Sequence, residues 1–210
     1  MHHIQYSIVA LLMKAGKKRF SELKPEGLES NLFQYHLKHT IKEGYVIKVD
    51  GGYALSPKGL YFADRHSSLL KTIREQPKTI TILVLQNRQG EVLMQQKSRQ
   101  PFIGSFHLPA GKIHEGETVH DAAQREIVEK TGLTSVELMY RSTVYVHISQ
   151  NDTLISEYIG FVFGGQYTGN VEEGVWRDFY DTRELAPSVA EVLASSKSEF
   201  GPPKEIFISL

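Results

Sequence analysis

Residues Gly111–Leu133 read GKIHEGETVHDAAQREIVEKTGL, and this stretch decides how the rest of the chain is interpreted. Glycines stand near both of its ends, and Glu126 and Glu129 lie three residues apart in its middle. Side chains three apart on a helix project to one side, so the two carboxylates can share one ion. Carboxylate oxygens are ligands that Mg²⁺ prefers. The stretch therefore predicts a loop, a helix and a loop around a divalent metal site.

Local signals support that helix and its boundaries. Gly111 and Gly116 allow the preceding loop to fold tightly against it. Thr118 with Asp121 predicts a capping box at its start. Gly132 is typical of a residue that ends a helix.

The fixed positions of this stretch, together with the preceding Leu108-Pro109-Ala110, resemble the Nudix box. That box marks hydrolases that cleave a nucleoside diphosphate linked to another moiety. The string from Leu108 to Ile113 is similar to that of ADP-ribose pyrophosphatases. The resemblance implies an α+β fold, a Nudix α/β/α sandwich, over residues 76–210. It also implies a Mg²⁺ or Mn²⁺ cofactor and a nucleoside diphosphate derivative as substrate.

The resemblance assigns roles residue by residue. It implies metal binding by Glu126, Glu129 and the backbone carbonyl of Ala110. Catalytic roles follow for Glu126 and Glu129, and for Glu173 in the late loop, where some family members add an acidic group. Bracing roles, which hold the loop without reacting, follow for Gly111, Glu117, Arg125 and Gly132.

One residue departs from the pattern. Lys130 stands where the family nearly always has a metal-binding glutamate. It lies four residues after Glu126, so its ammonium group can pair with that carboxylate. A cation there would repel magnesium, although two glutamates and a carbonyl could still hold one metal ion. Lys130 could also contact the diphosphate directly.

The first 75 residues have a different organisation. Apolar residues at helical spacing predict helices over 5–14 and 29–43, with a short helix near Ser21, taken as its N-cap, between them. Asp50-Gly51-Gly52 is a strong turn signal between two short strands. Ser56-Pro57 opens a fourth helix to about residue 67.

This order resembles a winged helix-turn-helix domain, over residues 1–75. In that family the third helix enters the major groove of DNA and the hairpin follows the phosphate backbone. The side chains that would contact double-stranded DNA are Ser30, Asn31, Gln34, Tyr35, Lys38 and Lys48. The alternative is a dimerisation or protein-binding module, because the same fold serves both purposes.

Residues 66–78 read as the connection between the two domains. Beyond them, alternating Ile80, Ile82 and Val84 precede the turn 87–90 and the apolar run 92–94, which predicts a β-hairpin. Further strands are expected over 135–147, 154–163 and 176–180, and a closing helix over 187–196. Strands on both sides of one central helix indicate an α+β domain.

Composition narrows the range of functions. The chain of 210 residues has no net charge, but residues 1–75 hold 12 Lys/Arg and 7 Asp/Glu, a net of +5, and the remainder −5. A basic first half favours an anionic polymer as partner. The chain has no cysteine, which excludes disulfides, thiolate zinc sites and cysteine nucleophiles. No apolar run is long enough to cross a bilayer, and we expect a cytoplasmic protein without a membrane partner.

Three functions remain open on these grounds. The first is a metal-dependent Nudix hydrolase with an accessory winged helix. The second is a DNA-binding transcriptional regulator, expected to be a homodimer, whose degenerate Nudix domain senses a nucleotide such as ADP-ribose. The third is a structural module without either activity. The box favours the first function, whereas Lys130 and the basic first half favour the second.

Overall fold

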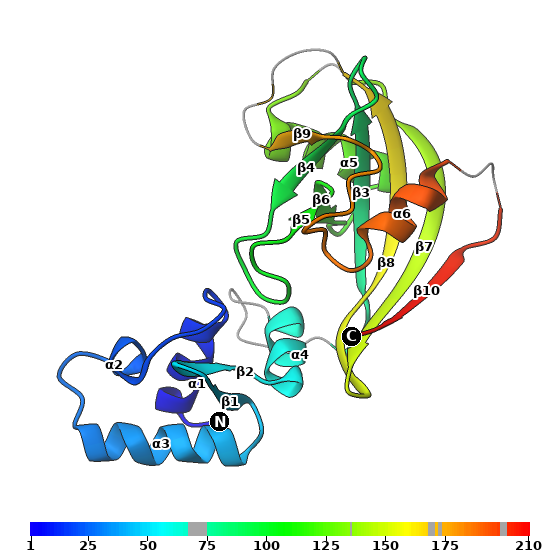
Figure 1. The fold of residues 1–210 in the computed structure, drawn as a ribbon. Helices are drawn as coiled ribbons and strands as arrows, with labels where there is room; N and C mark the ends of the chain where they lie inside the picture. Colours follow the sequence, from blue (N-terminus) through cyan, green and yellow to red (C-terminus); the bar gives the residue numbers. More distant parts are fainter. Residues whose placement is uncertain (67–74, 135, 168–170, 172–173, 198–200) are drawn as a thin grey trace.

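The computed structural model describes residues 1–66, 75–134, 136–167, 171, 174–197 and 201–210 (Figure 1). In the described part of the first half, helices surround a two-stranded antiparallel sheet. The elements are α1 (His3–Leu12), α2 (Phe20–Leu23), α3 (Ser30–Lys42), β1 (Val46–Val49), β2 (Gly52–Leu55) and α4 (Pro57–Arg65). Their order is the one expected from the sequence.

The buried side chains of this half form one cluster of their own. Ile8, Leu12 and Phe33 are fully enclosed in it, and Phe62 brings α4 into the same core. Burial of apolar area at about 25 cal/mol per Å² is the main force that holds these short elements together. Among the described residues, this cluster contains only side chains from the first half.

The second half is built on a large mixed sheet. Its described elements are β3 (Lys78–Gln86), β4 (Val92–Gln96), β5 (Phe106–His107), β6 (Ala110–Lys112), α5 (Val119–Thr131), β7 (Met139–Gln150), β8 (Thr153–Gln166), β9 (Val175–Arg177), α6 (Val189–Ser196) and β10 (Lys204–Ser209). The strand order is β10-β7-β8-β3-β4-β5, while β6 pairs with β3 and β9 with β4. The mixed α+β class is confirmed.

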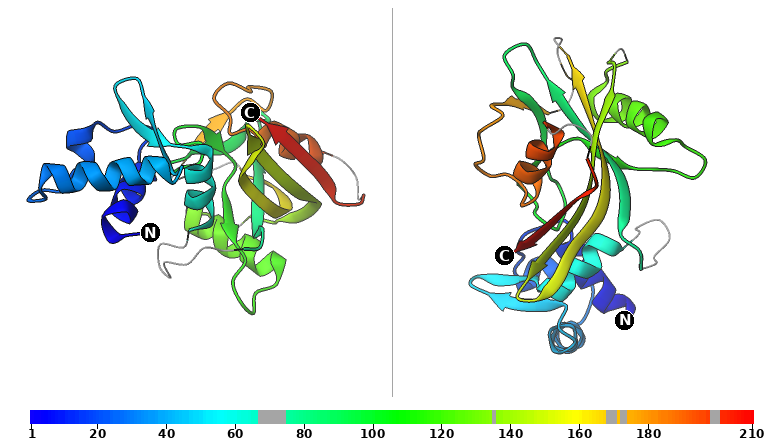
Figure 2. Two further views of the ribbon diagram at one scale, coloured as in Figure 1. Left: turned by 90° about the horizontal axis from the view of Figure 1, so that it is seen from below. Right: turned by 90° about the vertical axis from the view of Figure 1, so that its right-hand side faces the viewer.

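Helices α5 and α6 cover opposite faces of this sheet (Figure 2). Successive side chains of a strand point to opposite faces of the sheet, so the side chains of β3 contribute to both faces. Ile82 and Val84 join the cluster that contains Val192 of α6, whereas Leu83 packs with Ile127 of α5. The alternating apolar residues seen in the sequence therefore supply two separate cores.

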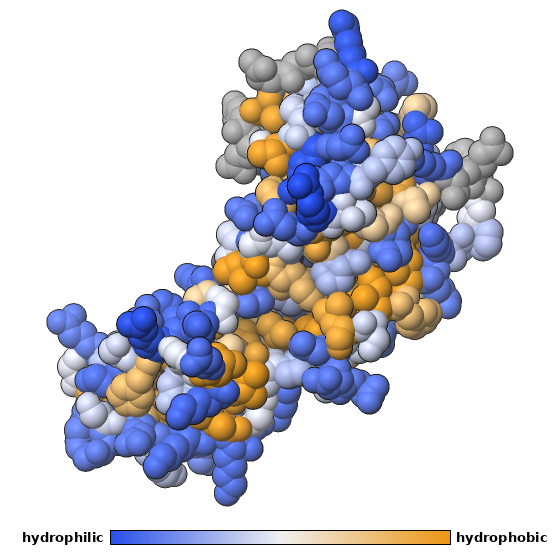
Figure 3. All heavy atoms as spheres, in the orientation of Figure 1, coloured by the Kyte–Doolittle hydropathy of each residue, from blue (hydrophilic) through white to orange (hydrophobic). Residues whose placement is uncertain are grey.

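Helix α4 joins the two halves by packing against β8. Arg65 Nη2 donates to Glu157 Oε2 at 3.0 Å, and Asp64 forms an ion pair with Lys78. Three of these four side chains are at most 13% exposed, so the charges are largely removed from water. In Figure 3, apolar residues gather where the two halves meet, and the outer ends are mostly polar.

Several expected boundaries were wrong in detail. Helix α1 begins at His3 because the backbone N–H of His2 donates to the Gln5 side chain at 2.6 Å, which closes the first turn. Helix α2 has Arg19, not Ser21, as its N-cap, because Glu22 accepts from the Arg19 N–H at 2.7 Å. The predicted connection 66–78 falls mostly outside the described residues.

Strand pairing departs further from the sequence prediction. β3 and β4 do follow each other around the turn at Gly90, but their register joins Gln86 to Val92. β3 pairs in parallel with β8 along its whole length, and Ile80, Thr81 and Ile82 also pair with β6. β10, which was not expected, adds a parallel edge strand to β7. Across the described residues, no helix has the length and hydropathy needed to cross a membrane.

Candidate functional site

Helix α5 and the short strand β6 form the framework of the candidate site. Thr118 caps α5 by accepting from the Asp121 N–H at 3.1 Å, and Gly132 ends it with φ of 72°. The predicted capping box is incomplete. The Asp121 carboxylate accepts from the Thr118 hydroxyl at 2.7 Å and is therefore held away from the Thr118 N–H.

Glu126 lies directly against the backbone of Gly111. A Cβ atom at position 111 would sit 1.6 Å from Glu126 Cδ and within 2.0 Å of both carboxylate oxygens. Only glycine leaves room for this approach. Glu126 is 4% exposed, and its Oε2 atom has no hydrogen-bond partner. A buried carboxylate oxygen without a partner is costly unless another group, such as a cation, satisfies it.

Arg125 gathers the acidic side chains of the site. Its guanidinium donates to both oxygens of Glu117, at 2.6 and 2.9 Å, and to Glu126 Oε1 at 2.6 Å. It also donates to Glu129 Oε2 at 3.3 Å and to the carbonyl of Lys112 at 2.9 Å. One planar side chain thus fixes the loop before α5, the helix itself and the end of β6.

The pKa values of this cluster follow from those contacts. The Arg125 hydrogen bonds, with a further one from the His114 N–H, lower the pKa of Glu117 to about 2. The same bonds to Glu117 and Glu126 raise the pKa of Arg125. Glu117 therefore stays ionised and Arg125 stays charged over the whole neutral range.

Glu129 and Lys130 lie at the C-terminal end of α5. The Glu129 side chain is 52% exposed, so it can exchange Arg125 for another cation. Among the ion pairs of the described residues, Glu126 is paired with Arg125 and not with Lys130, although the helical spacing permits the second contact. The charge of Lys130 acts on His107, whose pKa it helps to lower.

The described residues do not by themselves make a complete metal cage. No group of three His, Asp or Glu side chains among them is close enough to hold an ion. The candidate donors present are Glu126 Oε2, Glu129 and the carbonyl of Ala110, which lies next to Gly111 in β6. Glu173 lies outside the described residues. The available donors are oxygens, which fit a Mg²⁺ or Mn²⁺ ion that keeps several waters.

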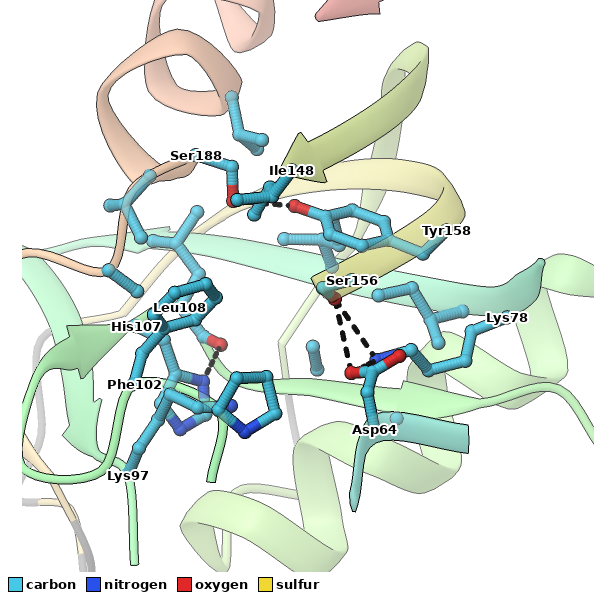
Figure 4. A pocket seen from close by; sticks show the side chains of 18 of the residues that line it. Asp64, Lys78, Lys97, Phe102, His107, Leu108, Ile148, Ser156, Tyr158 and Ser188 are labelled. Atoms are coloured by element: carbon cyan, nitrogen blue, oxygen red, sulfur yellow. Dashed lines mark hydrogen bonds and ion pairs between the residues drawn. The ribbon is translucent and has the colours of Figure 1, made fainter. Parts of the chain in front are cut away.

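A cavity of about 250 Å³ opens beside this framework (Figure 4). Ala110, Gly111 and Lys112 form the wall that it shares with the candidate metal site. Figure 4 labels Phe102, His107 and Lys97 on one side of it and Asp64 and Lys78 on the other. At the end formed by β8 and the residues before α6, Tyr158 and Ser188 share a hydrogen bond of 2.8 Å.

Burial shapes the chemistry of that cavity. It lowers the pKa of His107 to about 4, with a further contribution from Lys97, so the imidazole is neutral at physiological pH. Burial, together with the neighbouring Lys78, lowers the pKa of Lys97. Sequence reasoning missed these residues and Asp64, because they come from four separate segments and no local motif joins them.

The residues predicted to contact DNA lie on one part of the first half. Ser30, Asn31, Gln34, Tyr35 and Lys38 are exposed on α3, and Lys48 is exposed on β1. The buried face of α3 carries Phe33, His36 and Leu37 instead. Exposure leaves the six side chains accessible to a partner.

Comparison with known proteins identifies the family of the second half. The model of the NUDIX domain matches residues 76–202. The chain is 35% identical over 123 residues to an uncharacterized Nudix hydrolase, YvcI, of Bacillus subtilis, covering 54% of this chain and 75% of that protein. It is 36% identical over 81 residues to an RNA pyrophosphohydrolase of Bartonella henselae, covering 39% of this chain and 43% of that protein.

Two further matches are more limited. The chain is 33% identical over 92 residues to the mouse 8-oxo-dGDP phosphatase NUDT18, covering 44% of this chain but 26% of that protein. The NUDIX domain of Shewanella oneidensis NrtR, solved in complex with ADP ribose, is similar with a TM-score of 0.47 at 19% identity, covering 59% of this chain and 88% of that chain. The chain spans less than half of the mouse and Bartonella proteins. Because the family model matches more than half of the chain, this protein belongs to the NUDIX domain family.

Proposed function

We propose that the protein is a Nudix-type hydrolase that cleaves the pyrophosphate of a nucleoside diphosphate linked to another moiety. The observation that carries this proposal is the buried Glu126 Oε2, which lies against Gly111 without a hydrogen-bond partner. The named relatives act on 8-oxo-dGDP and on RNA, and this supports a phosphorylated nucleotide as substrate.

The donor oxygens of Glu126, Glu129 and Ala110 would hold Mg²⁺ or Mn²⁺. Such an ion, when bound, neutralises phosphate oxygens and makes a hydroxide available at neutral pH. Arg125 orients Glu126 by donating to its Oε1 atom, while Gly111 keeps the backbone close to its carboxylate. Lys130 adds positive charge near the cavity, where it can attract a phosphate.

The test is hydrolysis of a panel of nucleoside diphosphate derivatives with Mg²⁺ or Mn²⁺. Glu126→Gln keeps the shape of the side chain and removes its charge, so we expect kcat to fall roughly 10²-fold or more. Glu115→Gln is the matched control, because Glu115 is exposed in the same loop and is not among the proposed metal ligands. Absence of turnover by the wild type across the panel contradicts the proposal.

A second candidate is a DNA-binding regulator whose Nudix domain senses a nucleotide. The exposed polar face of α3 and the exposed Lys48 support it, as does the element order of a winged helix-turn-helix domain. In this proposal a homodimer binds double-stranded DNA upstream of its own gene through the six side chains named above.

That candidate is tested by DNA retention at several salt concentrations. Changing Asn31, Gln34 and Lys38 together to Ala should abolish specific retention of DNA. The loss of Lys38 should also lower the slope of log affinity against log salt concentration by about one, because one phosphate contact is lost. Lys204→Ala, an exposed lysine of β10, is the control. Equal retention of all three proteins rules out α3 as the DNA-reading helix.

A further inference from the structure

Helix α4 of the first half forms part of the wall of the cavity in the Nudix domain. Its Asp64 side chain is 4% exposed and faces the cavity between Lys78 and Ser156 (Figure 4). The carboxylate is paired with Lys78 and accepts from Ser156 Oγ at 3.1 Å. An anionic group of the protein itself therefore stands inside the candidate ligand site.

The charges along this wall leave a surplus of cations. Lys78 and Lys97 both line the cavity, whereas Asp64 is the only carboxylate among the described residues that do so. Burial lowers the pKa of Lys97, and the positive charge of the nearby Lys78 lowers it further. Since two nearby cations repel each other, a group with more negative charge than one carboxylate would satisfy them better.

The position of the cavity indicates that this more negative group is a phosphate of the ligand. Its other wall is Gly111 and Ala110, next to Glu126, where the proposed function places a pyrophosphate. A nucleotide that extends from there into the cavity brings a phosphate or its linked moiety toward Lys97 and Lys78. A phosphate carries more charge and more acceptor oxygens than the carboxylate of Asp64.

We propose that a phosphate of the ligand binds Lys78 and Lys97 and displaces Asp64 from Lys78, so that ligand binding weakens the attachment of α4 to the sheet. This inference rests on the proposed nucleotide site. A displaced carboxylate cannot stay buried beside a phosphate, because like charges in a poorly solvated place repel strongly. Asp64 then has to move toward water, and α4 moves with it.

The displacement would reach the rest of the first half through the core. Phe62 and Ala63 of α4 pack in the same cluster as Phe33 and Leu37 of α3. Interiors are close-packed and transmit a shift of one element to its neighbours. The second anchor, Arg65 with Glu157, lies outside the cavity, so it limits how far α4 can move.

Competition between Asp64 and the ligand for Lys78 can be distinguished from a role in which Asp64 only holds Lys78 in place. If Asp64 competes with the ligand, Asp64→Asn should tighten binding of inorganic phosphate and of pyrophosphate, measured by calorimetry without metal, about 5-fold or more. Asp152→Asn is the charge-matched control on the exposed turn between β7 and β8, and it should leave both affinities unchanged. Unchanged or weaker binding by Asp64→Asn overturns the proposal, as does absence of binding by every variant.

Coupling to α4 is tested separately by Glu157→Gln, which weakens the second anchor without touching the cavity. Because linkage is reciprocal, this variant should also bind phosphate more tightly than the wild type, by a smaller factor than Asp64→Asn. Weaker or equal binding by Glu157→Gln overturns the coupling.

A third test measures amide hydrogen exchange in the wild-type protein, so its result does not depend on whether a variant folds. Saturating phosphate should speed exchange of the amides in α4 and leave those in α6 unchanged. Slower or unaltered exchange in α4 overturns the proposal. None of these measurements needs turnover, so a protein that binds phosphate in this way but hydrolyses nothing would refute the proposed hydrolase and retain the inference.

Discussion

The charge of Lys130 acts on His107, which lines the cavity, while Arg125 holds the carboxylate of Glu126. The Glu126 Oε2 atom has no hydrogen-bond partner, and Lys130 lies four residues further along the same helix. A positive charge nearby weakens binding of a divalent cation and strengthens binding of a phosphate. Under the proposed function, we therefore expect Lys130 to lower metal affinity and to raise the affinity for a phosphate ligand.

Exchanging this charge gives the first prediction. Lys130→Glu should raise Mg²⁺ affinity and the rate of metal-dependent hydrolysis, each by roughly 10-fold or more, because it removes a repulsion and adds a carboxylate. Lys130→Gln, which only removes the charge, should give a smaller gain in metal affinity. Metal titration and initial rates measure both. If the two variants behave alike, the added carboxylate has no access to the ion.

His107 gives a prediction about pH. Its pKa falls from about 6.5 in the unfolded chain to about 4 in the fold, because burial and Lys97 disfavour the charged ring. Between these values the unfolded state binds a proton that the folded state does not, so stability should fall as pH drops from about 6.5 toward 4. Denaturation of His107→Gln should show less of this loss than the wild type. An imidazole NMR titration near 6.5 in the folded protein contradicts the assignment.

At the scale of elements, β6 approaches α5 closely at Gly111. Gly111→Ala would place a methyl group 1.6 Å from Glu126 Cδ, so either the strand or the carboxylate has to move. We expect a loss of about 1–3 kcal/mol in the free energy of unfolding and a fall in kcat of at least about 10-fold.

The matched control for that substitution is Gly16→Ala. A Cβ at position 16 meets its nearest atom, in Ile103, at 3.9 Å, which is an ordinary contact. The free energy of unfolding of this variant, measured by chemical denaturation, and its initial rate of hydrolysis should both be close to those of the wild type. A Gly111→Ala protein with normal activity would mean that Glu126 does not depend on this approach.

The same elements show what the sequence could predict. Short-range signals were sufficient for α5, because the Thr118 cap, the Gly132 terminus and the apolar face are encoded within the helix. Parallel pairing of β3 with β8 depends on residues some eighty positions apart, and no local pattern specifies it. β10 was missed because a short alternating segment such as 204–209 has the same pattern in a strand as in a loop.

The candidate site divides in the same way. Glu126, Glu129 and Arg125 were located because they belong to one motif. Asp64 and Lys97 reach the cavity from α4 and from the segment after β4, so their proximity arises only from tertiary packing. Helical spacing permits a contact between Lys130 and Glu126 but does not require one. The guanidinium of Arg125, which is already fixed by Glu117, binds the Glu126 carboxylate instead.

Across the whole molecule, α4 makes the two halves depend on each other. Arg65 is 5% exposed and Glu157 13% exposed, so Arg65→Ala leaves a largely buried carboxylate without its main cation. We expect a loss of about 3 kcal/mol in stability. Trp176, the only tryptophan, reports unfolding of the second half by fluorescence, while circular dichroism follows the helices of both halves.

In the wild type these two probes should give coincident transitions. In Arg65→Ala they should separate, with circular dichroism changing first, because the first half loses its anchor to the sheet. Coincident transitions in the variant, at an unchanged denaturant midpoint, would mean that α4 contributes little to the coupling.

The arrangement at Lys130 has a consequence for how this site can evolve. Lysine and glutamate codons differ only in their first base, so one nucleotide change converts one residue into the other. Among the described contacts, residue 130 is fixed by its backbone carbonyl, which accepts from Gln95 at 2.8 Å, and any side chain preserves that bond. Under the two proposed functions, single point mutations at position 130 would therefore exchange a pocket that retains its ligand for a fast hydrolase, and back again, while leaving the fold intact.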